Sequence, residues 1–465
     1  MVWSVRNVVY SGVLERLAKR GIDVHLLMPH DPPPIDQSDY SDFSWASAYH
    51  PIFTPEITQA VRGKSFLDAV IYSAYNRRNN IISYPLYRQW EERNFTPMEQ
   101  LRSQITEILG IASQPRPIYN LLCSYEDWGY HKGHNLEPIY AQLRELKPDA
   151  IWSTVCVSSL EYPYALAAQA LKIPIITSIL SFDNLTSRSV LPPYDHYMVW
   201  NESMRDQLLQ FYEGVAPNQV TMTGTPQFDF HRNRDFIWSR QKTLDRLGLA
   251  STARYFLYAA SHEELTPEEP ALVAQMVTKM AQDDTLKDYW LIIRLHPLDD
   301  WGRWDVVFKE TDNVLYSNAW DTQPDKEGWT FSSPTDQSRL ISSLAHAEAC
   351  LNIASTASLD AAAVDCPVIG IEFTDEPDSP RDMLYHEYDT THYKPLVDSG
   401  GLRLAHNWAE LANLMKTAVT DRGKDQEKRM TMMTQECGPQ DGQAGERVVN
   451  TIIEFLEKQQ GNQDA

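Results

Sequence analysis

The sequence predicts an α/β protein in which two doubly wound domains face a cleft. Its 465 residues are enough for two domains of ~100–200 residues each. In both halves, short apolar runs alternate with amphipathic runs, a pattern typical of a parallel sheet covered by helices on both faces. We therefore expect an N-terminal domain over residues 1–228 and a C-terminal domain over 229–444. A last helix with a polar tail would occupy 445–465.

The N-terminal half begins with a predicted helix over 8–20, ended by Gly21 as a C-cap, and a strand over 22–28. Only Met1 to Trp3 remain for a strand before the segment Val5-Arg6-Asn7 and that helix, so the usual first strand is missing or very short. Residues 30–120 are predicted to be helical and irregular. After residue 136 the alternation is regular, and the strands are predicted at 150–154, 173–178, 197–200 and 220–222.

The C-terminal half follows a polar stretch over 226–246, where the alternation stops and the domain junction is expected. Beyond it, strands are predicted at 255–259, 289–293, 349–353 and 368–371. Helices are predicted at 270–282 and 358–364. Open parallel sheets bind ligands beyond the carboxyl ends of their strands, so loops that follow these strands are the candidate site.

Composition restricts the partners of the chain. A formal net charge of −22 repels phosphates, which argues against a nucleic-acid partner. The five cysteines are scattered, which argues against a disulfide framework and a zinc site, and no metal is expected. No apolar run approaches the ~20 residues that span a membrane, and a cytoplasmic location is the simplest interpretation. Peripheral membrane association stays open.

The strongest local motif is the hydroxyl-rich segment Ser355-Thr356-Ala357-Ser358, which follows a predicted strand and opens a helix. Free amides and the positive end of a helix dipole can hold an anion such as a diphosphate. Asp360, one turn after Thr356, could accept ribose hydroxyls. The alternative is an ordinary helix cap formed by Ser355 or Thr356.

Two further segments follow strands of the C-terminal half. Arg294 and His296 come directly after the strand over 289–293, and His296 could donate a hydrogen bond to a phosphate oxygen. Ser261 and His262 follow the strand over 255–259 in the equivalent position. The alternatives are a structural histidine and an ordinary polar loop.

At the end of the N-terminal half, Gly224 and Thr225 could approach a ligand closely or act as a hinge, and the hinge is the favoured interpretation. Asp183 and Asn184 follow the strand over 173–178. Asp183 could serve as a catalytic base, whereas the alternative for both residues is an Asx turn.

Together these segments resemble a family. The order of 183–184, 223–226, 294–297 and 355–360 is similar to that in bacterial surface-polysaccharide transferases, including CDP-glycerol glycerophosphotransferase-like proteins and relatives of the UDP-N-acetylglucosamine 2-epimerase fold. The resemblance implies a GT-B fold with a nucleotide-diphosphate donor in the C-terminal domain and a carbohydrate or glycolipid acceptor in the N-terminal domain. It implies no metal or further cofactor, and a last helix that crosses back to the first domain.

Carried over by position, His296, Ser355, Thr356, Ala357 and Asp360 would contact the donor. Arg6, Asn7 and Asn184 are expected on the acceptor side. Asp360 stands where glutamate is common in this fold. The hypothesis is transfer of a glycosyl or polyol-phosphate group, with Asp183 and His296 as catalytic residues. The alternatives are a nucleotide-sugar epimerase of the same fold and a non-catalytic nucleotide-sugar-binding partner protein.

Overall fold

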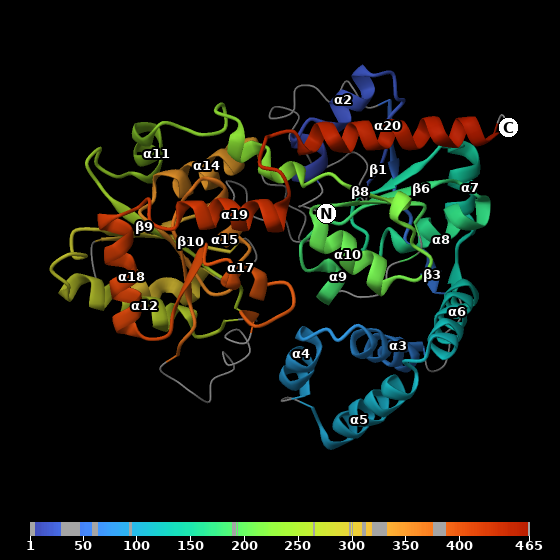
Figure 1. Ribbon diagram of the computed structural model, residues 1–465, viewed down its shortest axis with the longest axis horizontal. Coiled ribbons are helices and arrows are strands. Elements are labelled where there is room, and N and C mark those ends of the chain that lie inside the picture. The colour runs from blue at the N-terminus through green and yellow to red at the C-terminus, as the bar shows by residue number, and fades with distance from the viewer. Residues whose placement is uncertain are drawn as a thin grey trace. The chain divides into compact units, whose positions relative to one another are not determined.

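The computed structural model describes residues 5–28, 47–57, 64–92, 95–187, 192, 194–263, 266–296, 299, 301–308, 313–318, 333–374 and 387–463. They belong to two compact units, residues 3–224 with 445–465 and residues 225–444. Each unit contains a parallel sheet with helices packed against it (Figure 1). The predicted α/β class with parallel sheets is therefore confirmed.

The first unit is built on a four-stranded parallel sheet in the order β5-β6-β7-β8. Its strands are β5 (Ile151–Ser153), β6 (Ile175–Ser178), β7 (His196–Val199) and β8 (Val220–Met222). Two small sheets accompany it: β1 (His25–Met28) pairs in parallel with β2 (Ala48–Pro51), and β3 (Glu56–Ile57) pairs antiparallel with β4 (His134–Asn135). The central strands lie within a few residues of the predicted ones.

The helices of the first unit include the C-terminal helix of the chain. They are α2 (Val13–Lys19), α3 (Lys64–Arg78), α4 (Ser83–Glu92), α5 (Pro97–Ala112), α6 (Arg116–Gly133), α7 (Glu137–Leu146), α8 (Tyr162–Leu171), α9 (Asn184–Ser187), α10 (Glu202–Phe211) and α20 (Ala444–Gln463). Val448 and Ile452 of α20 share one apolar cluster with Leu17 of α2 and with Ile176 and Met198 of the sheet. The last helix therefore packs on the unit that begins the chain.

The start of the chain differs from the prediction. The expected continuous helix over 8–20 is instead a π-helical segment, Val5–Tyr10, followed by α2. Gly12, with a φ of 72°, separates the two segments. A φ in the left-handed region interrupts a right-handed helix, and glycine adopts it without strain. The prediction about Met1 to Trp3 lies outside the described residues.

The second unit is built on a six-stranded parallel sheet in the order β11-β10-β9-β12-β13-β14. Its strands are β9 (Tyr255–Ala259), β10 (Trp290–Arg294), β11 (Val314–Ser317), β12 (Cys350–Asn352), β13 (Val368–Ile371) and β14 (Leu402–Ala405). The four predicted strands are present. β11 and β14 were not predicted, because strands at the edges of the sheet are partly exposed and carry mixed polar and apolar residues.

Helices cover both faces of this sheet. They are α11 (Arg240–Leu247), α12 (Glu269–Gln282), α13 (Asp305–Phe308), α14 (Pro334–His346), α15 (Ala357–Ala363), α17 (Lys394–Asp398), α18 (Trp408–Thr420) and α19 (Gln426–Cys437). Phe256 and Tyr258 of β9 pack in one cluster with α12 and α18. Tyr255, which points to the opposite face, donates to the carbonyl of Ser343 in α14 at 2.7 Å. No helix in the described ranges is long and apolar enough to cross a bilayer.

Candidate functional site

The second unit contains a topological switch point. If its strands are numbered along the chain from β9 to β14, their spatial order is 3-2-1-4-5-6, the doubly wound order of dinucleotide-binding sheets. The order reverses between β9 and β12, which are hydrogen-bonded neighbours. Loops that leave the carboxyl ends of two such strands run to opposite faces and leave room for a ligand. Ser261, His262 and the 354–356 turn all lie in these loops.

The loop after β9 is held by Glu269, in the first turn of α12. The Glu269 side chain is fully buried, and its carboxylate accepts hydrogen bonds from the Tyr258 hydroxyl at 2.8 Å and the Thr266 hydroxyl at 2.9 Å. It also accepts from the Ser261 amide, at 3.0 and 3.2 Å. Burial raises the pKa of Glu269 to about 7, although these hydrogen bonds and the charge of Arg303 act in the opposite direction.

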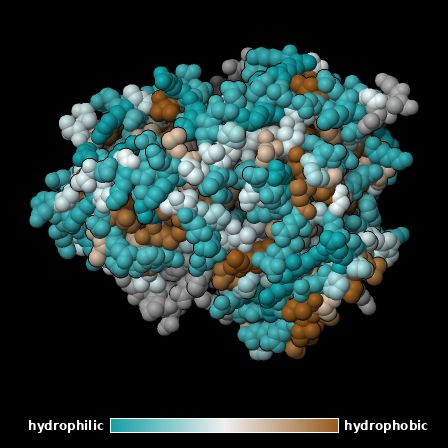
Figure 2. Space-filling model, viewed as in Figure 1, coloured by the Kyte–Doolittle hydropathy of each residue, from teal (hydrophilic) through white to brown (hydrophobic). Residues whose placement is uncertain are grey.

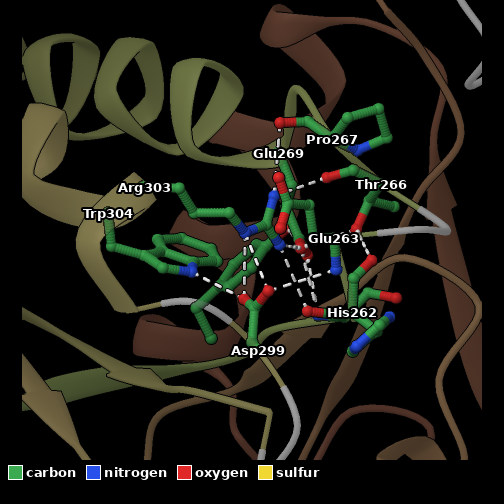
Figure 3. A network of polar contacts seen from close by, with 10 residues as sticks. His262, Glu263, Thr266, Pro267, Glu269, Asp299, Arg303 and Trp304 are labelled. Carbon is green, nitrogen blue, oxygen red and sulfur yellow. Dashed lines mark hydrogen bonds and ion pairs between the residues drawn. The ribbon is translucent and has the colours of Figure 1, made fainter.

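Arg303 and Asp299 extend this network to the loop after β10 (Figure 3). Arg303 donates to both carboxylate oxygens of Asp299, at 2.9 and 3.0 Å, and to the carbonyls of Thr266 and Ser261. The Trp304 indole and the Glu263 amide donate to the same carboxylate. The loops after β9 and β10 are therefore fixed to each other by charge-assisted hydrogen bonds.

His262 and His296 come together in this arrangement. Their rings form an edge contact with 5.5 Å between centroids. Burial lowers the pKa of His296, His262 lowers it further, and Asp299 acts in the opposite direction. A neutral imidazole can donate one hydrogen bond and accept another. Pro297, the last residue of the 294–297 motif, lies outside the described residues.

The turn after β12 corrects the prediction of an open set of amides. The Ser355 amide donates to Asn352 Oδ1 at 3.0 Å, and the Ala357 amide donates to Ser355 Oγ at 3.2 Å. The Ser358 amide donates to the Ser355 carbonyl. These three amides are satisfied inside the segment, so a ligand would meet the exposed Thr356 rather than a row of free amides.

Ser358 and Asp360 also differ from their predicted roles. Ser358 is fully buried, and its hydroxyl is hydrogen-bonded to Asn352 Oδ1 and to the Tyr393 hydroxyl. Asp360 is buried, and its carboxylate lies 3.1 Å from His231 Nε2. Buried charges need partners, and the Asp360 carboxylate has a histidine beside it.

Arg294 ends β10 in a cluster of charged groups. Burial lowers the pKa of its guanidinium to about 10, and the nearby carboxylates of Asp336 and Asp360 oppose this shift. Arg294 and Arg339 both donate to the Asn318 carbonyl, at 3.4 Å each. The arginine keeps its positive charge at neutral pH at the carboxyl end of the sheet.

In the first unit, the predicted acceptor residues are packed inside. Arg6 and Asn7 are buried in the π-helical segment, where Arg6 Nε donates to Asn7 Oδ1 at 3.3 Å. Asn184 Oδ1 accepts from the Ser181 amide, three residues before it, at 3.0 Å, which is not the bond of an Asx turn. Asp183 is half-exposed after β6.

The two residues predicted at the junction adopt different conformations. Gly224 has a φ of 71°, in the left-handed region that glycine adopts without strain, as a tight turn requires. Thr225 is buried and precedes a short 3-10 turn over Pro226–Phe228.

Four residues of the second unit were missed by the sequence analysis: Glu269, Asp299, Arg303 and His231. One signal was available, because Thr266-Pro267-Glu268-Glu269 has the spacing of a capping box at a helix start. The four-residue spacing of Asp299 and Arg303 also permits an ion pair, whereas no sequence signal pairs His231 with Asp360. No group of three His, Cys, Asp or Glu side chains in the described ranges could hold a metal ion.

No family model and no curated protein matches this sequence. Solved structures are similar over most of the chain at low identity. MnaA from S. aureus in its UDP co-structure is 16% identical, with 69% of this chain and 78% of that one covered and a TM-score of 0.45. UDP-GlcNAc 2-epimerase from Neisseria meningitidis bound to UDP-GlcNAc is 14% identical, with 69% and 80% covered and a TM-score of 0.43.

A glycosyltransferase from Rickettsia africae ESF-5 is 10% identical, with 70% of this chain and 81% of that one covered and a TM-score of 0.42. At identities and TM-scores this low, the likeness assigns no residue and no activity to this chain. The membership in a particular transferase group stays a prediction.

Proposed function

We propose that the protein transfers a glycosyl or polyol-phosphate group from a nucleotide-diphosphate donor to a hydroxyl acceptor. The observation that carries the proposal is the meeting of His262 and His296 beside the switch point of a 3-2-1-4-5-6 sheet. This is the position where doubly wound sheets bind phosphorylated ligands. Ser261 and Thr356 lie in loops that leave the same edge of the sheet, and Ala357 begins α15.

In this proposal the donor diphosphate binds at the carboxyl ends of β9, β10 and β12. His296 donates a hydrogen bond to the oxygen on which negative charge grows as the bond to the transferred group breaks. The positive charge of Arg294 adds an attraction to the diphosphate. A hydrogen-bond donor placed at a developing charge typically raises turnover ~10²–10³-fold. Asp183 is the proposed base for the acceptor hydroxyl, and the acceptor is a carbohydrate or glycolipid.

A thermal-shift screen against UDP-, CDP-, GDP- and CMP-linked donors tests the binding step. A donor present at 100 times its Kd should stabilise the fold by about 2.7 kcal/mol. If none of the four classes raises the melting temperature, the proposed donor site is wrong.

The chemical step is tested with the best donor, with and without acceptors. His296→Ala should lower turnover ~10²–10³-fold, whereas His406→Ala, which removes an exposed imidazole paired with Glu372, should leave it unchanged. Equal turnover in the two variants removes His296 from the mechanism. Conversion of the donor sugar without any acceptor would identify the epimerase alternative, and binding without turnover would identify the non-catalytic one.

A further inference from the structure

Helix α5 is amphipathic, but its apolar face points outward. Thr106, Glu107 and Gly110 are its buried residues, and they face α3. The Glu107 carboxylate accepts from the hydroxyls of Ser73 at 2.8 Å and Tyr84 at 2.7 Å. A helix of a water-soluble domain normally buries its apolar stripe and exposes its polar one. The reversed arrangement leaves the apolar stripe of α5 exposed in the part of the chain that the structure describes.

Helix α6 continues this surface. Of the seventeen large hydrophobic residues that are exposed in the described part of the chain, ten lie on α5 and α6. We call these ten the outer apolar surface: Met98, Leu101, Ile105, Ile108, Leu109, Ile111, Ile118, Leu121, Tyr125 and Trp128. Figure 2 shows hydrophobic residues gathered over both helices on the face that it views. Scattered single residues would need no explanation, but ten on two consecutive helices do.

The spacing of these residues suits helix pairing. On α5 the positions 98, 101, 105 and 108 are three and four residues apart, and on α6 the positions 118, 121, 125 and 128 repeat the same spacing. This is the spacing of the seam along which two helices interlock. Tyr125 and Trp128 are half-exposed, and large aromatic residues of this kind are enriched at the centres of protein interfaces.

The area also suits a dimer. Ten side chains exposed by 40% to 74% present on the order of 600 Å² of apolar surface, if a full side chain presents ~100 Å². One partner of a standard interface buries ~800 Å², of which slightly more than half is apolar. The outer apolar surface is therefore as large as one side of a stable protein–protein interface.

Charge favours a second copy of the chain over an anionic lipid surface. α5 and α6 carry Glu99, Glu107, Glu126 and Asp127 against Arg102, Arg116 and Lys132, a net charge of 3 − 4 = −1. The whole chain carries −22. Helices that lie on anionic membranes are rich in lysine and arginine, which these two are not. Two copies that meet at a nearly neutral face also bring little like charge together at the contact.

We propose that α5 and α6 form the interface of a homodimer, in which the outer apolar surfaces of two copies pack against each other. One patch that contacts itself across a two-fold axis is the commonest form of self-association. The same face would then be covered in solution, which accounts for a helix that buries Glu107 and exposes Ile108. This inference does not depend on the proposed transfer reaction.

Analytical ultracentrifugation of the full chain tests the interface at concentrations from ~0.1 to ~10 μM. The expected mass is twice the chain mass of 53.4 kDa. Ile108→Glu and Leu121→Glu should each weaken association at least about 30-fold, because each places two charges in the interface. Met430→Glu changes a similarly exposed residue on α19 and should leave association unchanged. Ile108→Leu should retain it.

Circular dichroism checks that each variant is folded, which is expected because Ile108 and Leu121 are exposed in the single chain. A wild-type mass of 53.4 kDa over the whole range would overturn the proposal. So would equal weakening by Met430→Glu. Flotation of monomeric wild-type protein with phosphatidylcholine–phosphatidylglycerol vesicles, lost in Ile108→Glu, would assign the surface to a membrane instead and would also overturn it.

Discussion

Replacement of Glu269 by glutamine should change how the stability of the second unit depends on pH. Burial raises the pKa of this carboxyl from 4.5 to about 7 in the folded state. Between these two values the folded chain keeps a proton that the unfolded chain has released, so stability falls as the pH rises. The contribution of the protonated Glu269 to stability is complete below pH 4.5 and is lost above pH 7. A shift of this size corresponds to about 3 kcal/mol.

Glutamine is neutral at every pH and has nearly the shape of the protonated carboxyl. Glu269→Gln should therefore match the wild type at about pH 4.5 and exceed it by about 3 kcal/mol at about pH 8. The hydroxyls of Tyr258 and Thr266 can turn to accept from the new amide group. Urea unfolding at several pH values measures the difference, and Glu457→Gln on the exposed side of α20 is the control. Parallel pH curves for wild type and Glu269→Gln would refute the reasoning.

Three further predictions concern the interior of the second unit. Burial also raises the pKa of Glu436 to about 7, so this residue should cause a similar loss of stability as the pH rises. Glu436→Gln should remove that loss in the same urea series. Asp360→Asn should lower the free energy of unfolding by about 3 kcal/mol, because it breaks a buried pair with His231 at 3.1 Å; a loss under 1 kcal/mol would show that this pair is not charged. Gly401→Ala should lower the free energy of unfolding by ~1–3 kcal/mol, because the added Cβ would lie 2.9 Å from a backbone oxygen of α19. Gly461→Ala should have no such effect, because a Cβ there meets nothing within 4 Å.

Some features of the candidate site follow from the local sequence, and others depend on residues far away along the chain. His296 and His262 could be proposed from the sequence because each directly follows a strand, and parallel strands end at one edge of a sheet. The hydrogen bonds of the 355–358 turn could not be predicted, because Ser355 can either leave its neighbours' amides free or bond to them. Which of the two occurs depends on Asn352 and Tyr393, and Tyr393 lies 35 residues from Ser358.

The sequence by itself determined the α/β class, the central parallel strands of both units and the loops that carry candidate residues, because periodicity and strand ends are local properties of the chain. Only the tertiary structure decided that Asp360 faces His231, that Arg303 joins two loops, and that α5 turns its apolar stripe outward. These three depend on which segments meet in space. A side chain's partner follows from burial and charge at that meeting point, and neither is written in the spacing of residues along the chain.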